Sequence, residues 1–281
     1  MGASVSSLAQ VVHDGGSSVE SPSTDPGVFA GAIVINLDRR PDRLKAFAEA
    51  VKATDLASLT TRRFSAIDAK HIPHGALQGL LTPVALRELQ MAQRTGMREH
   101  HSQLTLGAVG CYLSHVQVWH QIAAASTGPD VPWLVFEDDA AFQVYDVQSR
   151  LALFFQQAVE AFELRFGPVS HVDNRFALVV NATGMCKAGC RASIHATHPA
   201  IVNPYLAYGL HCYALTPRMA AKLLLLSTPP VLPIDVQLDT FLSMHPAVVF
   251  ATPSTFAGSP VGQSGSPTDI QTHTLTPFLF R

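Results

Sequence analysis

Apolar segments alternate with polar, turn-forming segments along the chain, and their spacing predicts an alternation of strands and helices. Short apolar or alternating runs predict strands at residues 31–37, 62–67, 131–137, 176–180, 206–215 and 247–250. Apolar residues at helical spacing predict helices at residues 43–51, 110–125, 147–164 and 217–226, with a further short helix after Pro233-Ile-Asp235. Pro41 stands where the first position of a helix is expected. The strand–helix–strand opening predicts an α/β fold whose parallel sheet is covered on both faces.

Four segments lack this periodicity. Residues 1–28 are rich in Ser, Gly and Pro, which predicts a disordered leader. Residues 68–106 and 183–204 predict long irregular loops, and loops of that length are usually functional or mobile. From about residue 253 the chain becomes rich in Ser, Pro, Gly and Thr. We therefore expect one folded domain over residues 29–281, with an irregular C-terminal tail.

The run at 131–137 ends in three consecutive carboxylates, Glu137, Asp138 and Asp139. Three acids after a buried strand repel one another unless a cation or a set of donors lies beside them. Oxygen ligands favour Mg²⁺ or Mn²⁺ over Zn²⁺, and α/β folds bind ligands at this rim of the sheet. In an extended segment Glu137 and Asp139 share a face while Asp138 points away. An acidic turn that caps the next segment is the alternative interpretation.

The composition permits a sizeable core, because 47% of the 281 residues are hydrophobic. The formal net charge of −2 provides no global field that would attract nucleic acid or an anionic membrane. No glycine-rich motif follows the first strand and no P-loop is present, which argues against nicotinamide-dependent and ATP-hydrolysing enzymes. The four cysteines do not make a disulfide scaffold, so we expect reduced thiols, or one local disulfide if the protein is secreted.

The sequence also bears on membrane association. No apolar stretch is long enough to span a bilayer, and the N-terminus lacks the basic start and apolar core of a signal peptide. We expect a cytoplasmic location, with the secretory pathway left open. Residues 1–6 fit the N-myristoylation pattern at Gly2. That pattern predicts a weak membrane tether, since one myristoyl chain binds only marginally; a plain disordered tail is the alternative.

Five short motifs follow one another along the chain, with a weaker sixth at residues 266–271. They read Asn36-Leu-Asp-Arg-Arg-Pro-Asp-Arg43, Gly110-Cys-Tyr-Leu-Ser-His115, Leu134-Val-Phe-Glu-Asp-Asp139, Tyr208-Gly-Leu-His-Cys-Tyr-Ala-Leu-Thr-Pro-Arg-Met-Ala-Ala-Lys-Leu223 and Leu232-Pro-Ile-Asp235. In this order and spacing they resemble glycosyltransferase family 25, which includes bacterial lipooligosaccharide galactosyltransferases and collagen hydroxylysine galactosyltransferases. The resemblance covers residues 31 to about 271, nearly everything outside the leader.

The resemblance implies a GT-A-like, Rossmann-related α/β fold with a mostly parallel sheet flanked by helices in a single domain. It also implies a transferase that uses a nucleotide sugar and a divalent ion, Mn²⁺ or Mg²⁺. A metal on the acidic cluster can act as a Lewis acid for the departing diphosphate. We expect Asp139 to hold the metal with Glu137 beside it, and Glu137 or Asp138 to contact the nucleotide.

Further site residues follow from the motif matches. Asn36, Arg40 and Arg43 match the family's Asn-Leu-x-x-Arg-x-x-Arg, and an arginine fork suits uracil or phosphate; a solvated helix start is the alternative for the arginines. Ser114 and His115 match the family's Ser-His. Donor contact and helix anchoring both stay open as roles for His115.

The base of the reaction is expected on a separate segment. Inversion at the anomeric carbon needs a base for the acceptor hydroxyl. Asp235 matches the family's Pro-Val/Ile-Asp, and Asp235 and Asp239 both qualify. A helix N-cap is the competing role for Asp235.

The leading hypothesis is therefore an inverting, metal-dependent transfer of a hexose, with galactose from UDP-galactose as the expected donor. The acceptor would be a hydroxyl on a glycan, a lipid-linked sugar or a hydroxylysine-type residue, and no nucleic-acid partner is expected. The rival hypothesis is a catalytically inactive protein with a transferase-like fold that binds a sugar nucleotide or a glycan.

Overall fold

The first strand of the chain pairs with two others, one on each side, and this arrangement creates the site. In the computed structural model, β1 (Gly31–Asn36) pairs in parallel with β2 (Thr61–Ser65) and with β3 (Trp133–Glu137). After β2 the chain crosses back over β1 before it enters β3, so the strand order reverses between β1 and β3. In α/β sheets, the carboxyl ends of strands at such a reversal point border a ligand-binding crevice.

The remaining strands extend the sheet on the far side of β3, to give the order β2-β1-β3-β7-β4-β8-β6-β5. Antiparallel pairs join β7 to β3 and β4, β6 to β8, and β5 to β6, whereas β4 and β8 are parallel. The bounds of these strands are β4 (Leu178–Asn181), β5 (Ser193–His195), β6 (His198–Asn203), β7 (Cys212–Leu215) and β8 (Val248–Ala251). The expected α/β fold is confirmed.

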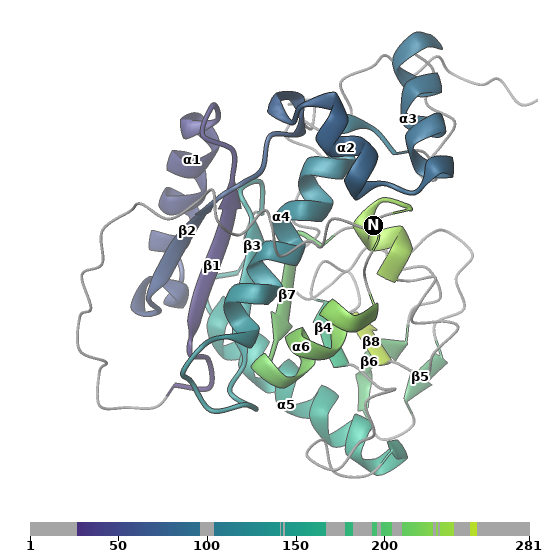
Figure 1. Cartoon of the computed structure of the whole chain (residues 1–281). Coiled ribbons are helices and arrows are strands. Elements are labelled where there is room, and N and C mark those ends of the chain that lie inside the picture. Colours follow the sequence, from purple (N-terminus) through teal and green to yellow (C-terminus); the bar gives the residue numbers. More distant parts are fainter. Residues whose placement is uncertain are drawn as a thin grey trace, which may run out of the picture.

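Helices cover both faces of the sheet, as Figure 1 shows. α4 (Leu106–Ala123) and α6 (Pro217–Leu226) contact each other on the face turned to the viewer. The other face carries α1 (Pro41–Lys52), α5 (Val147–Phe166) and the short helix η2 (Asp55–Ser58), which contacts both of them.

The alternation of side chains along β3 explains this two-sided covering. Phe136 packs against Phe47 of α1 and against Phe142, with ring centroids 5.6 Å apart in each pair. The next residue, Glu137, points to the opposite face and meets His115 of α4. Because consecutive strand residues face opposite sides, an apolar residue inside β3 is followed by a polar one on the α4 side.

The prediction of an irregular loop over residues 68–106 is wrong for most of that segment. It contains η3 (Ala69–His71), α2 (His74–Leu80) and α3 (Pro83–Thr95). These helices bury Leu77, Leu81 and Leu89 in a second apolar cluster against Val109 and Leu113 of α4. Proline usually interrupts regular structure, but Pro73 and Pro83 each stand at the start of a helix, where proline is tolerated.

Two other expectations also change. The segment 183–204, expected to be a loop, contains β5 and β6. α4 begins at Leu106, four residues before the predicted start, because the Thr105 hydroxyl accepts a hydrogen bond from the Ala108 amide at 3.1 Å and caps the helix.

The structure describes residues 27–95, 104–140, 142, 144–166, 178–181, 193–195, 198–203, 210–226, 229, 231–238 and 248–251. The predicted leader, up to residue 26, and the predicted tail lie outside these residues, and so does Asp239. Within the described part of the chain, no helix combines the length and the apolar character that a membrane span needs.

Candidate active site

Asn36, the last residue of β1, is hydrogen-bonded to β2, to the residue after β3 and to the residue before α1. Its side chain is 1% exposed. The side-chain nitrogen donates to Asp138 Oδ2 at 2.7 Å and to the Arg40 carbonyl at 2.9 Å, and the side-chain oxygen accepts from Arg63 Nε at 3.0 Å. Every hydrogen-bonding atom of this buried amide side chain therefore has a partner, and Asn36 holds the carboxyl ends of β1 and β3 together.

The three acids at the end of β3, whose last residue is Glu137, point in different directions. Asp138 turns toward Asn36 and toward Arg43, whose Nη1 lies 3.3 Å from Asp138 Oδ1 and 3.6 Å from Asp139 Oδ2. Glu137 and Asp139 instead both face His211, on the segment that leads into β7. The predicted division of the triplet, with Asp138 on the other side, matches these contacts.

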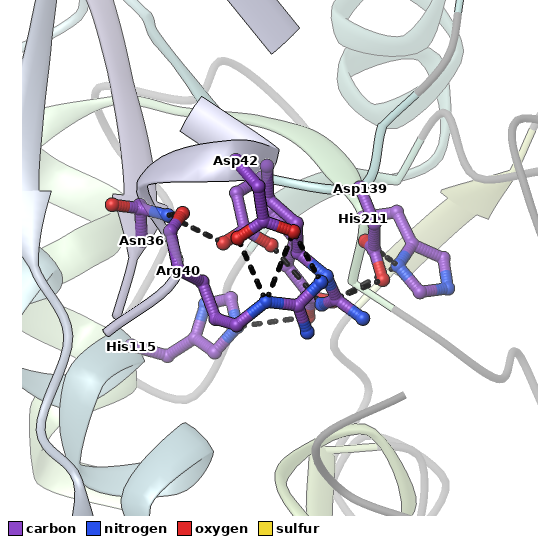
Figure 2. Close-up of polar contacts among 9 residues, drawn as sticks. Asn36, Arg40, Asp42, His115, Asp139 and His211 are labelled. Carbon is purple, nitrogen blue, oxygen red and sulfur yellow. Dashed lines mark hydrogen bonds and ion pairs between the residues drawn. The ribbon is translucent and has the colours of Figure 1, made fainter. Parts of the chain in front are cut away.

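His211 completes the acidic cluster, and Figure 2 shows it beside Asp139. Its Nδ1 lies 2.9 Å from Glu137 Oε2 and 3.3 Å from Asp139 Oδ1. The backbone fixes this approach, because the Glu137 amide donates to the His211 carbonyl at 3.0 Å. Sequence reasoning assigned no role to His211. Its position two residues before Tyr213, in a motif shared with the family, was the available signal.

Glu137, Asp139 and His211 fit a divalent ion. Among the described residues, Asp139 Oδ1 stands out as a buried side-chain oxygen without a hydrogen-bond partner, although it lies near the His211 ring. One ligand atom from each of the three residues lies within 4.8 Å of the others. Neighbouring ligands of an octahedral ion with bonds of about 2.1 Å stand about 3 Å apart. Two carboxylates and an imidazole suit Mn²⁺.

Without an ion, the positive charge of His211 and the negative charges of Glu137 and Asp139 stabilise one another. Burial by itself would raise the pKa of Glu137, but the charge of His211 and hydrogen bonds from His115 and His211 hold this pKa below its usual range. Burial would lower the pKa of His211, but the charges of Glu137 and Asp139 hold it well above its ordinary value. Burial raises the pKa of Asp138 despite the hydrogen bond from Asn36 and the charge of Arg43.

A buried polar chain orients Glu137 from the α4 side. His115 Nε2 lies 3.3 Å from Glu137 Oε1, and His115 Nδ1 lies 3.0 Å from the Tyr213 hydroxyl. Trp119 Nε1 donates to the same hydroxyl at 2.9 Å. Because an indole only donates and a carboxylate only accepts, the partners favour a proton on His115 Nε2 and a Tyr213 proton directed to Nδ1. His115 therefore fixes the position of the Glu137 side chain by linking it to Tyr213.

Arg40 and Ser114 play structural parts in this conformation. The Arg40 guanidinium binds Asp42, with Nη2 2.8 Å from Oδ2, while its backbone carbonyl receives Asn36 (Figure 2). This ion pair lowers the pKa of Asp42 to about 2. The Ser114 hydroxyl donates to the Gly110 carbonyl at 2.7 Å and accepts from the Ile67 amide at 2.8 Å. Since Ser114 is 1% exposed, its contacts support a positioning role rather than ligand contact.

Asp235 lies in a short helical turn at residues 234–238. Gln237 holds this turn on α4 by donating to the Tyr112 hydroxyl at 3.0 Å, and its side-chain oxygen accepts from the amides of Val231 and Leu232. The charge of Asp235 acts on Cys111 together with the charges of Glu137 and Asp139. Asp235 stands on a separate segment from the acidic cluster, and its carboxylate accepts a hydrogen bond from the Val236 amide at 2.9 Å.

The fold and the site define a class of protein: an α/β fold with an acidic, metal-compatible cluster at the reversal point of its sheet. A family model for glycosyltransferase family 25, described as an LPS biosynthesis protein, matches residues 29–238. The chain belongs to glycosyltransferase family 25.

Individual relatives agree with this assignment. The chain is 27% identical over 235 residues to the human inactive glycosyltransferase 25 family member 3, and 25% identical over 218 residues to a glycosyltransferase 25 family member of Drosophila melanogaster. It is 25% identical over 224 residues to procollagen galactosyltransferase 1 of Danio rerio. The matches cover 81%, 76% and 79% of this chain and 34%, 31% and 33% of the relatives. The chain thus spans about a third of the length of these relatives.

Proposed function

We propose that the protein transfers a hexose, galactose from UDP-galactose, to a hydroxyl acceptor with inversion of the anomeric carbon, and that the reaction depends on Mn²⁺. The observation that carries this proposal is the Glu137–Asp139–His211 donor set beside Asn36 and Arg43. It lies where the parallel strands β1 and β3 end, and the carboxyl ends of parallel strands are the part of an α/β sheet that binds nucleotides.

The donor would bind across the carboxyl ends of β1 and β3. Asn36 and Arg43 lie at this edge, and the Arg43 guanidinium is held between Asp138 and Asp139. An arginine in this position offers a planar fork for a phosphate oxygen as the donor enters. Mn²⁺ held by Glu137, Asp139 and His211 would supply Lewis-acid stabilisation of the diphosphate leaving group.

Asp235 is the proposed base. The acceptor hydroxyl oxygen forms a bond to the anomeric carbon from the face opposite the nucleotide. The bond from that carbon to the diphosphate oxygen breaks, and its electron pair leaves with UDP. The acceptor proton passes to the carboxylate of Asp235, which stands on the turn that the Gln237 side chain ties to Tyr112 of α4. Asp239 is the other carboxylate proposed for this role.

The test is UDP release from UDP-galactose in the presence of Mn²⁺ and a panel of hydroxyl acceptors, including hydroxylysine peptides and lipid-linked or free glycans. Asp139→Asn, which keeps the shape of the side chain and removes its charge, is expected to abolish release. Asp146→Asn is the matched control, because Asp146 is an exposed acid that pairs with Arg150. If wild-type protein releases no UDP from any UDP-sugar while it still binds Mn²⁺, catalysis is not its function.

A specific observation favours a second candidate, a non-catalytic binder of sugar nucleotides or glycans. The human relative that matches 81% of this chain is named inactive. Such a binder would show saturable UDP-galactose binding without UDP release. If ligand binding also survives in Asp139→Asn, it would be independent of the metal, which separates this candidate from the enzyme.

A further inference from the structure

A second set of metal-ligating side chains lies against the acidic cluster, on its α4 side. Cys111 precedes His115 by one helical turn, so both side chains lie on the same face of α4. Together with Glu137 they offer a sulfur, a nitrogen and an oxygen, all within 4.8 Å of one another. Cys111 is only partly buried, which leaves a route for an ion from solvent. The proposed transfer reaction uses no thiol.

The geometry of the two nearer ligands suits a tetrahedral ion. Zn²⁺ binds nitrogen and oxygen ligands at about 2.0–2.2 Å, which places two such ligands about 3.3 Å apart at a tetrahedral angle. His115 Nε2 and Glu137 Oε1 lie 3.3 Å apart. That separation is long for an N–H···O hydrogen bond and matches a pair of zinc ligands.

The surroundings of His115 support metal binding as well. Metal-bound histidines usually hold their other ring nitrogen through a hydrogen bond, which fixes the ring and its tautomer. His115 Nδ1 already faces the Tyr213 hydroxyl at 3.0 Å. The ring proton can shift from Nε2 to Nδ1 and be accepted there by that hydroxyl.

The charges around Cys111 also favour a cation. The charged groups that act on the thiol are Glu137, Asp235 and Asp139, and all three are carboxylates. Their negative potential disfavours a bare thiolate but attracts a divalent ion. Once the ion is bound to the sulfur, its positive charge stabilises the thiolate.

The two carboxylate oxygens of Glu137 point to different ligand sets, so the Cys111–His115–Glu137 set is distinct from the proposed Mn²⁺ site. Glu137 Oε1 faces His115, whereas Oε2 faces His211, and Figure 2 shows the two histidines on opposite sides of the cluster. A mixed sulfur, nitrogen and oxygen set selects Zn²⁺ over Mn²⁺, because thiolate is a soft ligand.

We propose that Cys111, His115 and Glu137 form a binding site for Zn²⁺, with a fourth position open to water, next to and distinct from the Mn²⁺ site. The thiol proton leaves to solvent as the Zn–S bond forms, and no oxidant or reductant is needed. This inference does not rest on the transferase activity, since metal binding can be measured without turnover.

The test uses Co²⁺ as a spectroscopic stand-in for Zn²⁺, because thiolate ligation to Co²⁺ gives a near-ultraviolet charge-transfer band. Cys186 and Cys190 are four positions apart and could contribute such a band, so the full chain with Cys186→Ser and Cys190→Ser serves as the reference. The metal-stripped reference protein is titrated with Co²⁺, and Zn²⁺ is then added. The expected result is a saturable thiolate band that Zn²⁺ removes, that Cys111→Ser abolishes and that Cys212→Ala retains.

A second variant tests the supporting hydroxyl. Tyr213→Phe is expected to weaken Zn²⁺ binding by roughly 10- to 100-fold, as loss of an outer partner of a ligating histidine does, measured by competition with a chromophoric chelator. Circular dichroism confirms that each variant is folded. Absence of the band from the folded reference protein, or its persistence in Cys111→Ser, would overturn the proposal.

Discussion

Asn36 donates a 2.7 Å hydrogen bond to Asp138 across 102 positions of sequence, and this bond joins the ends of the neighbouring strands β1 and β3. Both side chains are nearly inaccessible to solvent, at 1% and 9% exposure. The amide also fixes the Arg40 carbonyl at the start of α1 and accepts a hydrogen bond from Arg63. Asn36 therefore adds a side-chain link to the backbone pairing of β1 and β3 that places the acidic cluster.

Asn36→Ala should lower the free energy of unfolding by about 1–3 kcal/mol, because the variant removes the Asn36 hydrogen bonds to Asp138 Oδ2 and to the Arg40 carbonyl and takes away the acceptor of Arg63 Nε. Urea unfolding followed by circular dichroism measures this loss. Asn36→Asp should cost at least as much, since it places a second carboxylate against Asp138. A loss in both variants that lies within error of zero would show that water satisfies these groups.

Gly110→Ala should destabilise the fold by about 1–3 kcal/mol, the usual cost of forcing extra volume into a packed interface. An added Cβ would overlap the Ile67 carbonyl and come within 3.1 Å of the Ala69 amide. Gly79→Ala in α2 is the matched control, because its Cβ would meet no atom within 4 Å. The control should be neutral or stabilised by up to about 1 kcal/mol, as alanine favours a helix. Equal stability of the two variants would contradict the close packing of α4 at Gly110 against the backbone of Ile67 and Ala69.

The Glu137–His211 pair predicts a pH window of stability for metal-free protein. The folded pKa of Glu137 is lowered, so its contribution is fully present above its ordinary value of 4.5 and is lost as pH falls toward the folded pKa. The folded pKa of His211 is raised, so its contribution is fully present below 6.5 and is lost as pH rises toward the folded pKa. The pair should thus stabilise most between about pH 4.5 and 6.5.

Thermal or urea unfolding in EDTA across pH 3–9 measures this window as the difference between wild type and His211→Gln. The variant should lack the decline above pH 6.5 and show a weaker decline below pH 4.5, where His115 still supports Glu137. A difference that does not vary with pH would exclude a charged pair at this position.

Mn²⁺ should raise the melting temperature through Glu137, Asp139 and His211. At a concentration about 100-fold above Kd, a ligand that binds only the folded state adds about 2.7 kcal/mol, and each kcal/mol shifts Tm by roughly 2–4 °C at this size. His211→Ala should remove most of the shift. His120→Ala should keep it, because His120 is exposed near the end of α4. An unchanged Mn²⁺ shift in His211→Ala would remove the imidazole from the ligand set.

Local pattern was sufficient for several features of the fold and of the site. The apolar runs that became β1 and β3 and the apolar spacing that became α1, α4 and α6 were predicted from the chain alone, since a strand buried on both faces is continuously apolar and the buried face of a helix repeats every 3.6 residues. The acidic triplet was predicted at the rim of the sheet for the same reason, because three charges cannot continue a buried strand. The local pattern failed to predict α2 and α3, which begin directly after Pro73 and at Pro83, because proline is also typical of loops.

The sequence by itself determined the α/β class, the family motifs and the end of β3 as the place of a candidate cation site. Only the tertiary structure decided which groups meet there. His211 reaches Glu137 from 74 positions away because β7 pairs antiparallel with β3. Arg63 and Tyr213 enter the site in the same manner, through strand pairing. The physical reason is that side-chain periodicity is a local property, whereas strand neighbours are selected by the burial and hydrogen bonding of the whole sheet.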